Sequence, residues 1–167
     1  MDLHMQSHRY VQRLPDWKAA CVAGFVAGAI LMVLELLWST LYTDTGPWPA
    51  MHMVAALMLG PGELQTAGFS LEIAAAALLA HYILGVAFGV ILACIIAPRH
   101  FDSSHRMVAI IGALFGVAMY AFNFYGMARV YTWFVEMRGW PTLVAHLVFG
   151  VSAALLYMQM EKRDPQT

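Results

Sequence analysis

Four long apolar stretches dominate the sequence and constrain what it can fold into. They cover residues 18–42, 71–97, 107–131 and 141–160. A helix of about 20 apolar residues spans the ~30 Å of hydrocarbon in a bilayer. Only 11% of the residues are charged, far below the ~25% of a typical soluble domain. No ten-residue alternating pattern suggests a β-barrel. The sequence therefore predicts an all-α integral membrane protein, a single transmembrane domain built as a four-helix bundle.

A fifth apolar segment, residues 50–59, is too short to cross a membrane. Ten helical residues reach only about 15 Å, and prolines flank the segment on both sides. We therefore expect a short re-entrant or interfacial helix on the outer side of the bundle. Its Met51-His52-Met53 triplet resembles the soft ligand set that suits Cu(I). Because successive helical residues point about 100° apart, we interpret the triplet as packing, with His52 only a weak metal-ligand candidate.

The positive charges near the helix ends predict the orientation of the chain. Cytoplasmic loops of membrane proteins carry an excess of Lys and Arg. Arg129 and Arg138 lie on the side of the 43–70 and 132–140 connections. The opposite side carries seven positive residues: Arg9, Arg13, Lys18, Arg99, Arg106, Lys162 and Arg163. We therefore expect both termini in the cytoplasm of a bacterial cell, with the protein in the inner membrane.

A seven-residue phrase, Ala-His-x-x-x-Gly-Val, occurs at residues 80–86 and again at 145–151, an offset of 65. The first and third apolar stretches also align, at an offset of 88, so that the two offsets differ by 23 residues. This alignment pairs Gly24, Gly28 and Glu35 with Gly112, Gly116 and Asn123. The pattern suggests two parallel hairpin repeats, with an insertion in the connection between the first two spans. Chance is the alternative, because glycine and alanine are common in membrane helices.

Four polar residues inside the apolar stretches form the candidate site. Counted at 1.5 Å per residue, they all fall about 8–15 Å below the outer interface. Each also shares a helix face with glycines that favour close packing. In an up-and-down bundle, the second and fourth spans would be diagonal neighbours, as would the first and third. The four residues are Glu35, His81, Asn123 and His146.

Several uses of such a cluster remain open at this stage. Zinc, iron or copper could bind Glu35, His81 and His146, with Asn123 as a weak ligand or hydrogen-bond partner. Haem b could be held between His81 and His146, with glycines one turn away making room. The cluster could instead relay protons or bind a small solute. Finally, the four side chains could simply hydrogen-bond one another and set the helix register.

The expected function is limited by the polar cluster and by the catalytic and nucleotide-binding motifs that the sequence lacks. It contains no phosphate-binding loop, nucleophile elbow, H-E-x-x-H motif or dinucleotide fingerprint, so we lean against an enzyme and expect no nucleic-acid partner. The main expectation is an accessory or structural subunit of a larger membrane complex, for example a respiratory one. Its partners would be lipid and other subunits or further copies of itself. A haem or metal redox protein and a proton-coupled solute transporter are the alternatives.

Overall fold

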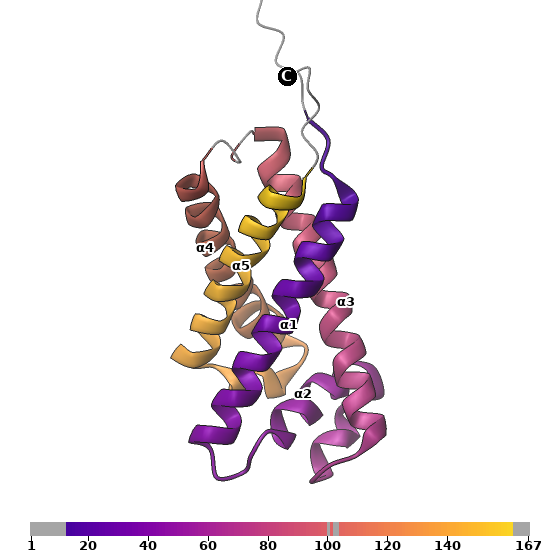
Figure 1. Ribbon diagram of the computed structural model, residues 1–167. Helices are drawn as coiled ribbons and strands as arrows, with labels where there is room; N and C mark the ends of the chain where they lie inside the picture. The colour runs from indigo at the N-terminus through magenta and orange to yellow at the C-terminus, as the bar shows by residue number, and fades with distance from the viewer. Residues whose placement is uncertain (1–12, 100, 102–103, 162–167) are drawn as a thin grey trace, which may run out of the picture.

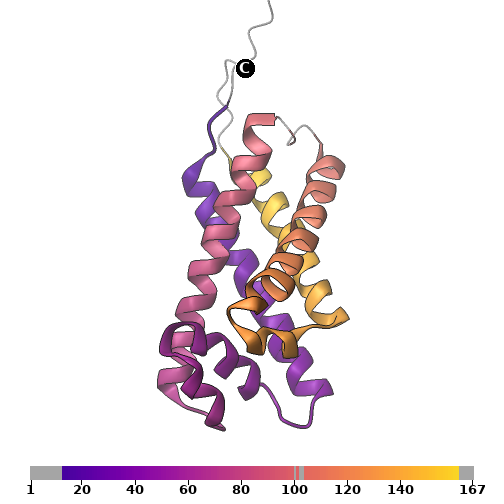
Figure 2. The same ribbon diagram turned by 180° about the vertical axis from the view of Figure 1, so that it is seen from behind.

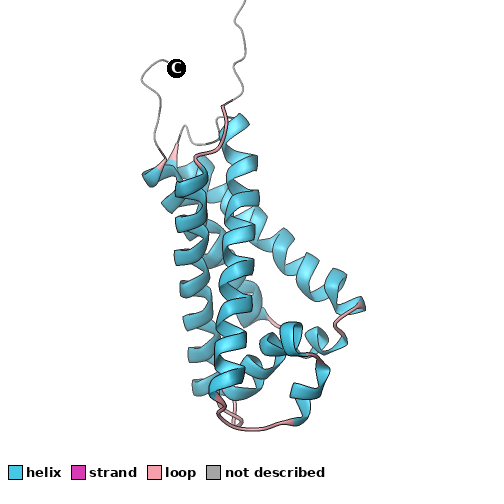
Figure 3. Ribbon diagram, turned by 90° about the vertical axis from the view of Figure 1, so that its right-hand side faces the viewer, coloured by secondary structure: helices cyan, strands magenta, loops and turns pink. Residues whose placement is uncertain are grey.

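The computed structural model describes residues 13–99, 101 and 104–161, and all the regular structure in this part of the chain is helical (Figure 3). Four of its helical segments are long and apolar enough to cross a membrane. They are built on α1 (Trp17–Tyr42), α3 (Leu71–Ile96), α4 (His105–Ala121) and α5 (Trp140–Met160). This confirms the predicted all-helical chain with four candidate spans.

Two of these helices begin directly after a residue whose side chain caps the first turn. The Asp16 carboxylate accepts a hydrogen bond from the Ala19 backbone N–H at 3.0 Å and caps α1. The Ser104 hydroxyl accepts from the Met107 N–H at 3.1 Å and caps α4. Asp and Ser are preferred at this position because their side-chain oxygens satisfy a backbone N–H that has no partner in the first turn.

A short helix, α2 (Trp48–Leu59), lies in the connection between α1 and α3 and is followed by the 3₁₀ turn η1 (Pro61–Gln65). It begins earlier than the sequence predicted because Pro49 is part of its first turn, where the missing N–H of proline costs no hydrogen bond. Figure 1 shows α2 at the end of the bundle opposite the start of α1. That this end is the outer one stays a prediction.

The third span changes helix type along its length. The α-helical part of α4 ends at Ala121, and the chain continues as a π-helical turn, η4 (Phe122–Gly126). Two 3₁₀ turns, η5 (Met127–Arg129) and η6 (Thr132–Met137), then lead to α5. A π turn of this kind is rare and is frequently found at functional sites. Here it carries Asn123.

Glycines bring the helices of each hairpin into backbone contact. On the α1–α3 side, a Cβ added to Gly24 would lie 2.5 Å from the carbonyl oxygen of Gly85. On the α4–α5 side, a Cβ added to Gly112 would collide with the carbonyl oxygen of Gly150. The proposed repeat aligns Gly24 with Gly112 and Gly85 with Gly150, so both hairpins close at matching positions. A common origin of the hairpins stays a prediction that this geometry favours.

The bundle is open along one seam. The helix α1 packs against both α3 and α5, and α5 packs along α4, whereas α3 makes few contacts with α4. Figure 2 looks onto this side, where α3 and α4 stand apart. The up-and-down bundle expected from the sequence is therefore not packed equally on all four sides. The two hairpins are joined mainly through α1 and α5.

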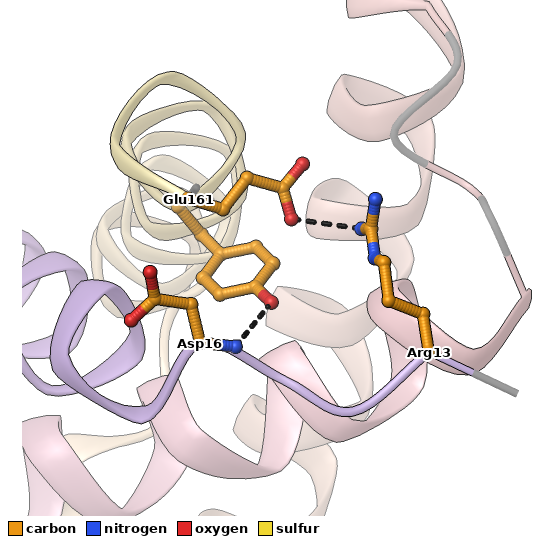
Figure 4. A network of polar contacts seen from close by, with 4 residues as sticks. Arg13, Asp16 and Glu161 are labelled. Atoms are coloured by element: carbon orange, nitrogen blue, oxygen red, sulfur yellow. Dashed lines mark hydrogen bonds and ion pairs between the residues drawn. The ribbon is translucent and has the colours of Figure 1, made fainter. Parts of the chain in front are cut away.

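A polar network ties the start of α1 to the end of α5 (Figure 4). The Tyr157 hydroxyl accepts a hydrogen bond from the Asp16 N–H at 3.1 Å, and Arg13 forms a 2.8 Å ion pair with Glu161. The beginning of the first span and the end of the fourth thus lie on the same side of the bundle. Three of the basic residues used to predict orientation, Arg9, Lys162 and Arg163, lie outside the described residues. Which side faces the cytoplasm stays a prediction.

Candidate functional site

The four polar residues singled out in the sequence line one cavity of about 140 Å³. Each comes from a different span: Glu35 from α1, His81 from α3, Asn123 from the π turn η4 and His146 from α5. A volume of this size exceeds what one water needs, and it is comparable with the ~150 Å³ apolar cavity that accepts a benzene molecule. The cavity therefore suits a molecule about as large as one aromatic ring.

Apart from these four residues, the cavity wall is apolar. The helix α2 forms part of it through Met51 and Val54, and η6 contributes Phe134. The short segments that connect the long helices are thus part of the cavity. Phenylalanine and methionine are prominent among the lining residues, which include Phe88, Phe124, Phe134, Phe149, Met32, Met51, Met119 and Met137.

Glu35 is the least satisfied polar group at this site. Its Oε1 atom is buried and has no hydrogen-bond partner among the described residues. The other interaction of the carboxyl group is with the Thr142 side chain on α5. A buried polar atom left without a partner costs about 1–3 kcal/mol, and more if the group is charged. Such an atom next to a cavity indicates a position where a ligand, a proton or water completes the hydrogen bonding.

His81 is held by the neighbouring helix. Its Nε2 atom lies 2.8 Å from the carbonyl oxygen of Gly28 on α1. Because a carbonyl only accepts hydrogen bonds, Nε2 carries the proton, and Nδ1 is the lone-pair nitrogen of the neutral ring. A Cβ added at Gly28 would lie 3.9 Å from Nε2, an ordinary van der Waals distance, so this contact does not itself require a glycine.

His146 is held within its own helix. Its Nδ1 donates to the carbonyl oxygen of Thr142 at 2.8 Å, and its Nε2 faces the side-chain amide nitrogen of Asn123 at 3.4 Å. The ring is buried and meets the edges or faces of Tyr120 and Phe124, with centroids 5.9 and 5.4 Å away. The π turn thus brings Asn123 to His146, and the aromatic rings fix the orientation of the imidazole.

His52, the weaker metal-ligand candidate, lies apart from this cluster. It is buried on α2, with Nε2 2.9 Å from the carbonyl oxygen of Gly68 and Nδ1 2.9 Å from that of Glu63. The Thr66 hydroxyl also lies 2.9 Å from Nδ1. Both ring nitrogens are therefore used in holding the connection between α2 and α3. This arrangement supports the packing interpretation of the Met51-His52-Met53 triplet.

The geometry bears on the metal and haem alternatives. Within the part of the chain that the structure describes, no three His, Cys, Asp or Glu side chains are grouped closely enough to hold one ion. Each histidine donates one ring N–H to a backbone carbonyl, as metal-bound histidines commonly do, so each keeps one nitrogen that could ligate. The cavity, however, has the size of a single ring, which favours a small molecule over a macrocycle of four pyrrole rings. Metal and haem binding stay untested predictions.

Two features of the site were missed in the sequence. Thr142 is buried, and its side chain contacts Glu35. Its backbone carbonyl oxygen accepts the hydrogen bond from Nδ1 of His146. Its spacing of four residues before His146 was the available signal, since residues four apart share a helix face. The cavity wall formed by α2 and η6 left no sequence signal, because it depends on how the connections fold back over the spans.

Comparison with known proteins adds nothing to this geometry: no family model matches the chain, and no curated protein or solved structure is significantly similar to it.

Proposed function

We propose that the protein binds a small solute inside the membrane, in the cavity lined by Glu35, His81, Asn123 and His146, and that it acts as a solute transporter. One observation carries the proposal: the buried, unpartnered Oε1 of Glu35 belongs to a residue that lines a cavity of ring size. Ionisable residues inside membrane spans are costly and mark solute or proton pathways by default.

Two further features support this function. The four polar residues come from all four spans, so a solute bound between them would contact both hairpins. The seam between α3 and α4 has few helix contacts, which makes it the easiest place for the hairpins to move relative to one another. Rocking of one helix pair against another around a central site is a common way for transporters to give alternating access.

The accessory-subunit role expected from composition stays a prediction. Glycine faces on membrane helices can contact a neighbouring subunit. Gly85 and Gly116 are buried inside the chain instead, against α1 and α5 respectively. The exposed apolar side chains of the spans are what contact with lipid requires, so they do not distinguish a lone protein from a subunit.

The proposal can be tested by filling the cavity. Ala77 is buried, lines the cavity and lies on α3, whereas Ala75, two residues earlier, is exposed. Thermal unfolding of the detergent-solubilised protein would be followed with toluene, benzyl alcohol and benzylamine as one-ring probes. We expect at least one probe to stabilise the wild type and Ala75→Leu but not Ala77→Leu. Stabilisation that is equal in both variants, or absent for all three probes, would contradict the proposal.

A further inference from the structure

Most of the hydrogen-bonding capacity that the protein leaves open in this cavity belongs to acceptors. His81 uses its Nε2 proton on the carbonyl of Gly28 at 2.8 Å, and His146 uses its Nδ1 proton on the carbonyl of Thr142 at 2.8 Å. A neutral imidazole has one donor and one acceptor. Both rings have therefore spent their donors on the backbone. His81 keeps Nδ1 as an open acceptor, whereas Nε2 of His146 already faces the side-chain amide of Asn123.

The other two polar residues add acceptors as well. The side-chain nitrogen of Asn123 faces Nε2 of His146 at 3.4 Å, which leaves the amide oxygen of Asn123 as an open acceptor and its second N–H as an open donor. The Oε1 atom of Glu35 has no partner among the described residues. In its ionised form a carboxylate only accepts hydrogen bonds, so a bound donor would complete the bonding of this oxygen and stabilise that form.

Positive charge is missing from the cavity wall. No Lys or Arg is among the described residues that line it. Arg138 is the basic residue on the neighbouring connection, and it is used elsewhere: its Nε donates to the Phe124 carbonyl at 2.6 Å, and its guanidinium stacks 4.4 Å from the centre of the Tyr125 ring. The rest of the wall is apolar and includes Phe88 and Phe149, and the faces of aromatic rings attract cations.

We propose that the solute is a small organic monocation, a protonated amine on an apolar body of about one ring, whose N–H groups face Glu35 and His81. This inference rests on the proposed function and names its solute class. An ammonium donor would complete the bonding of the Glu35 oxygen, and the ion pair would carry no net charge in the low-dielectric interior of the membrane. The apolar body would fill the space between the phenylalanine and methionine side chains.

The same observations argue against a bare metal ion as the solute. An ion needs several ligands converging on one point, and no three acidic, histidine or cysteine side chains do so among the described residues. An ammonium group needs only one or two acceptors, because its attached body makes the remaining contacts. The acceptors of this site lie in an apolar wall and are not grouped at one point among the described residues, which fits the second case.

Four probes of equal ring size separate the solute classes: benzylamine (protonated at pH 7), benzyl alcohol, toluene and benzoate. Their binding to the full-length protein in lipid nanodiscs would be measured by calorimetry. We expect benzylamine to bind at least about tenfold more tightly than benzyl alcohol, and benzoate not to bind. The preference should be lost in Glu35→Gln, which keeps the shape of the side chain. It should be retained in Glu72→Gln, because Glu72 is exposed in the first turn of α3.

The outcomes distinguish this inference from the function on which it rests. Equal binding of benzylamine, benzyl alcohol and toluene, or a preference for benzoate, would overturn the amine assignment and leave solute binding standing. Absence of binding by all four probes would overturn both. A preference for benzylamine that persists in Glu35→Gln would place the cation elsewhere and also overturn the inference. If Glu35→Gln does not fold, Ala77→Leu replaces it, and benzylamine binding retained by that variant is the contradicting result.

Discussion

Nε2 of His81 lies 2.8 Å from the carbonyl oxygen of Gly28 and joins α3 to α1 by a side-chain hydrogen bond. The equivalent histidine of the other hairpin, His146, instead donates to Thr142 within its own helix. Two residues that occupy matching positions in the repeated phrase thus have different structural roles. His81 links two helices, while His146 bonds within its own helix and turns Nε2 towards Asn123 at the cavity.

Replacing His81 by alanine should weaken the α1–α3 hairpin. Hydrogen bonds between membrane helices contribute about 0.6 kcal/mol on average and up to about 1.7 kcal/mol, so we expect a loss in this range from the free energy of unfolding. Reversible unfolding in mixed micelles would measure it. His105→Ala, at an exposed position in the first turn of α4, is the control and should have almost no effect. Equal stabilities of the two variants would show that the bond contributes nothing.

Gly112→Ala and Gly150→Ala should each destabilise the α4–α5 hairpin. An added Cβ at either glycine would collide with the backbone carbonyl of the other, and backbone cannot move aside as a flexible side chain can. We expect a loss of about 1–3 kcal/mol or more, the usual cost of overpacking a well-packed interior. Gly62→Ala is the matched control, because nothing lies within 4 Å of a Cβ there and its φ is not in the left-handed region. Wild-type stability of Gly112→Ala would contradict the close helix contact.

His52→Ala should loosen the connection that covers the cavity. Its Nε2 lies 2.9 Å from the carbonyl oxygen of Gly68, and its Nδ1 lies 2.9 Å from both the carbonyl oxygen of Glu63 and the hydroxyl of Thr66. The same helix supplies Met51 to the cavity wall. We expect faster hydrogen exchange in residues 61–70 and weaker solute binding, with little change in the exchange of α4 and α5. Met58→Ala, at an exposed position on the same helix, should change neither. Unaltered exchange in His52→Ala would mean that other contacts hold this segment.

The four spans could be predicted from the sequence because their length and apolarity follow directly from the thickness of a bilayer. The common depth of Glu35, His81, Asn123 and His146 could also be predicted, since the rise per residue of a helix is fixed. Four residues far apart in the sequence are therefore expected near one level of the membrane, and in the structure all four line one cavity.

What could not be predicted depends on contacts rather than on periodicity. The π turn that carries Asn123 replaces α-helical geometry over Phe122–Gly126, and no hydropathy pattern marks such a change. The open seam between α3 and α4 results from which helices the glycines bring together, and glycine spacing alone does not name the partner helix. The partners of the two histidines are decided by local geometry, so similar sequence phrases gave different hydrogen bonds.

Reporter fusions would determine the orientation of the chain. The excess of Lys and Arg predicts that both termini are cytoplasmic, and the structure places the start of α1 beside the end of α5. A reporter that is active only outside the inner membrane should therefore be silent after Thr167 and active within residues 61–68. The opposite pattern would reverse the orientation and place the four polar residues in the cytoplasmic leaflet.

Removal of metal ions should leave solute binding unchanged. Because the proposed site needs only Glu35 and neighbouring acceptors, the stabilisation by benzylamine should be the same before and after dialysis against a strong chelator. The purified protein should also show no stoichiometric metal by elemental analysis and no Soret band in its optical spectrum. If metal or haem is present, His81→Ala should remove it, and Glu35→Gln should reduce metal content far more than haem content. Such a result would revive the cofactor alternatives, because a ligated His81 would use the accepting nitrogen that the solute-binding proposal assigns to the cavity.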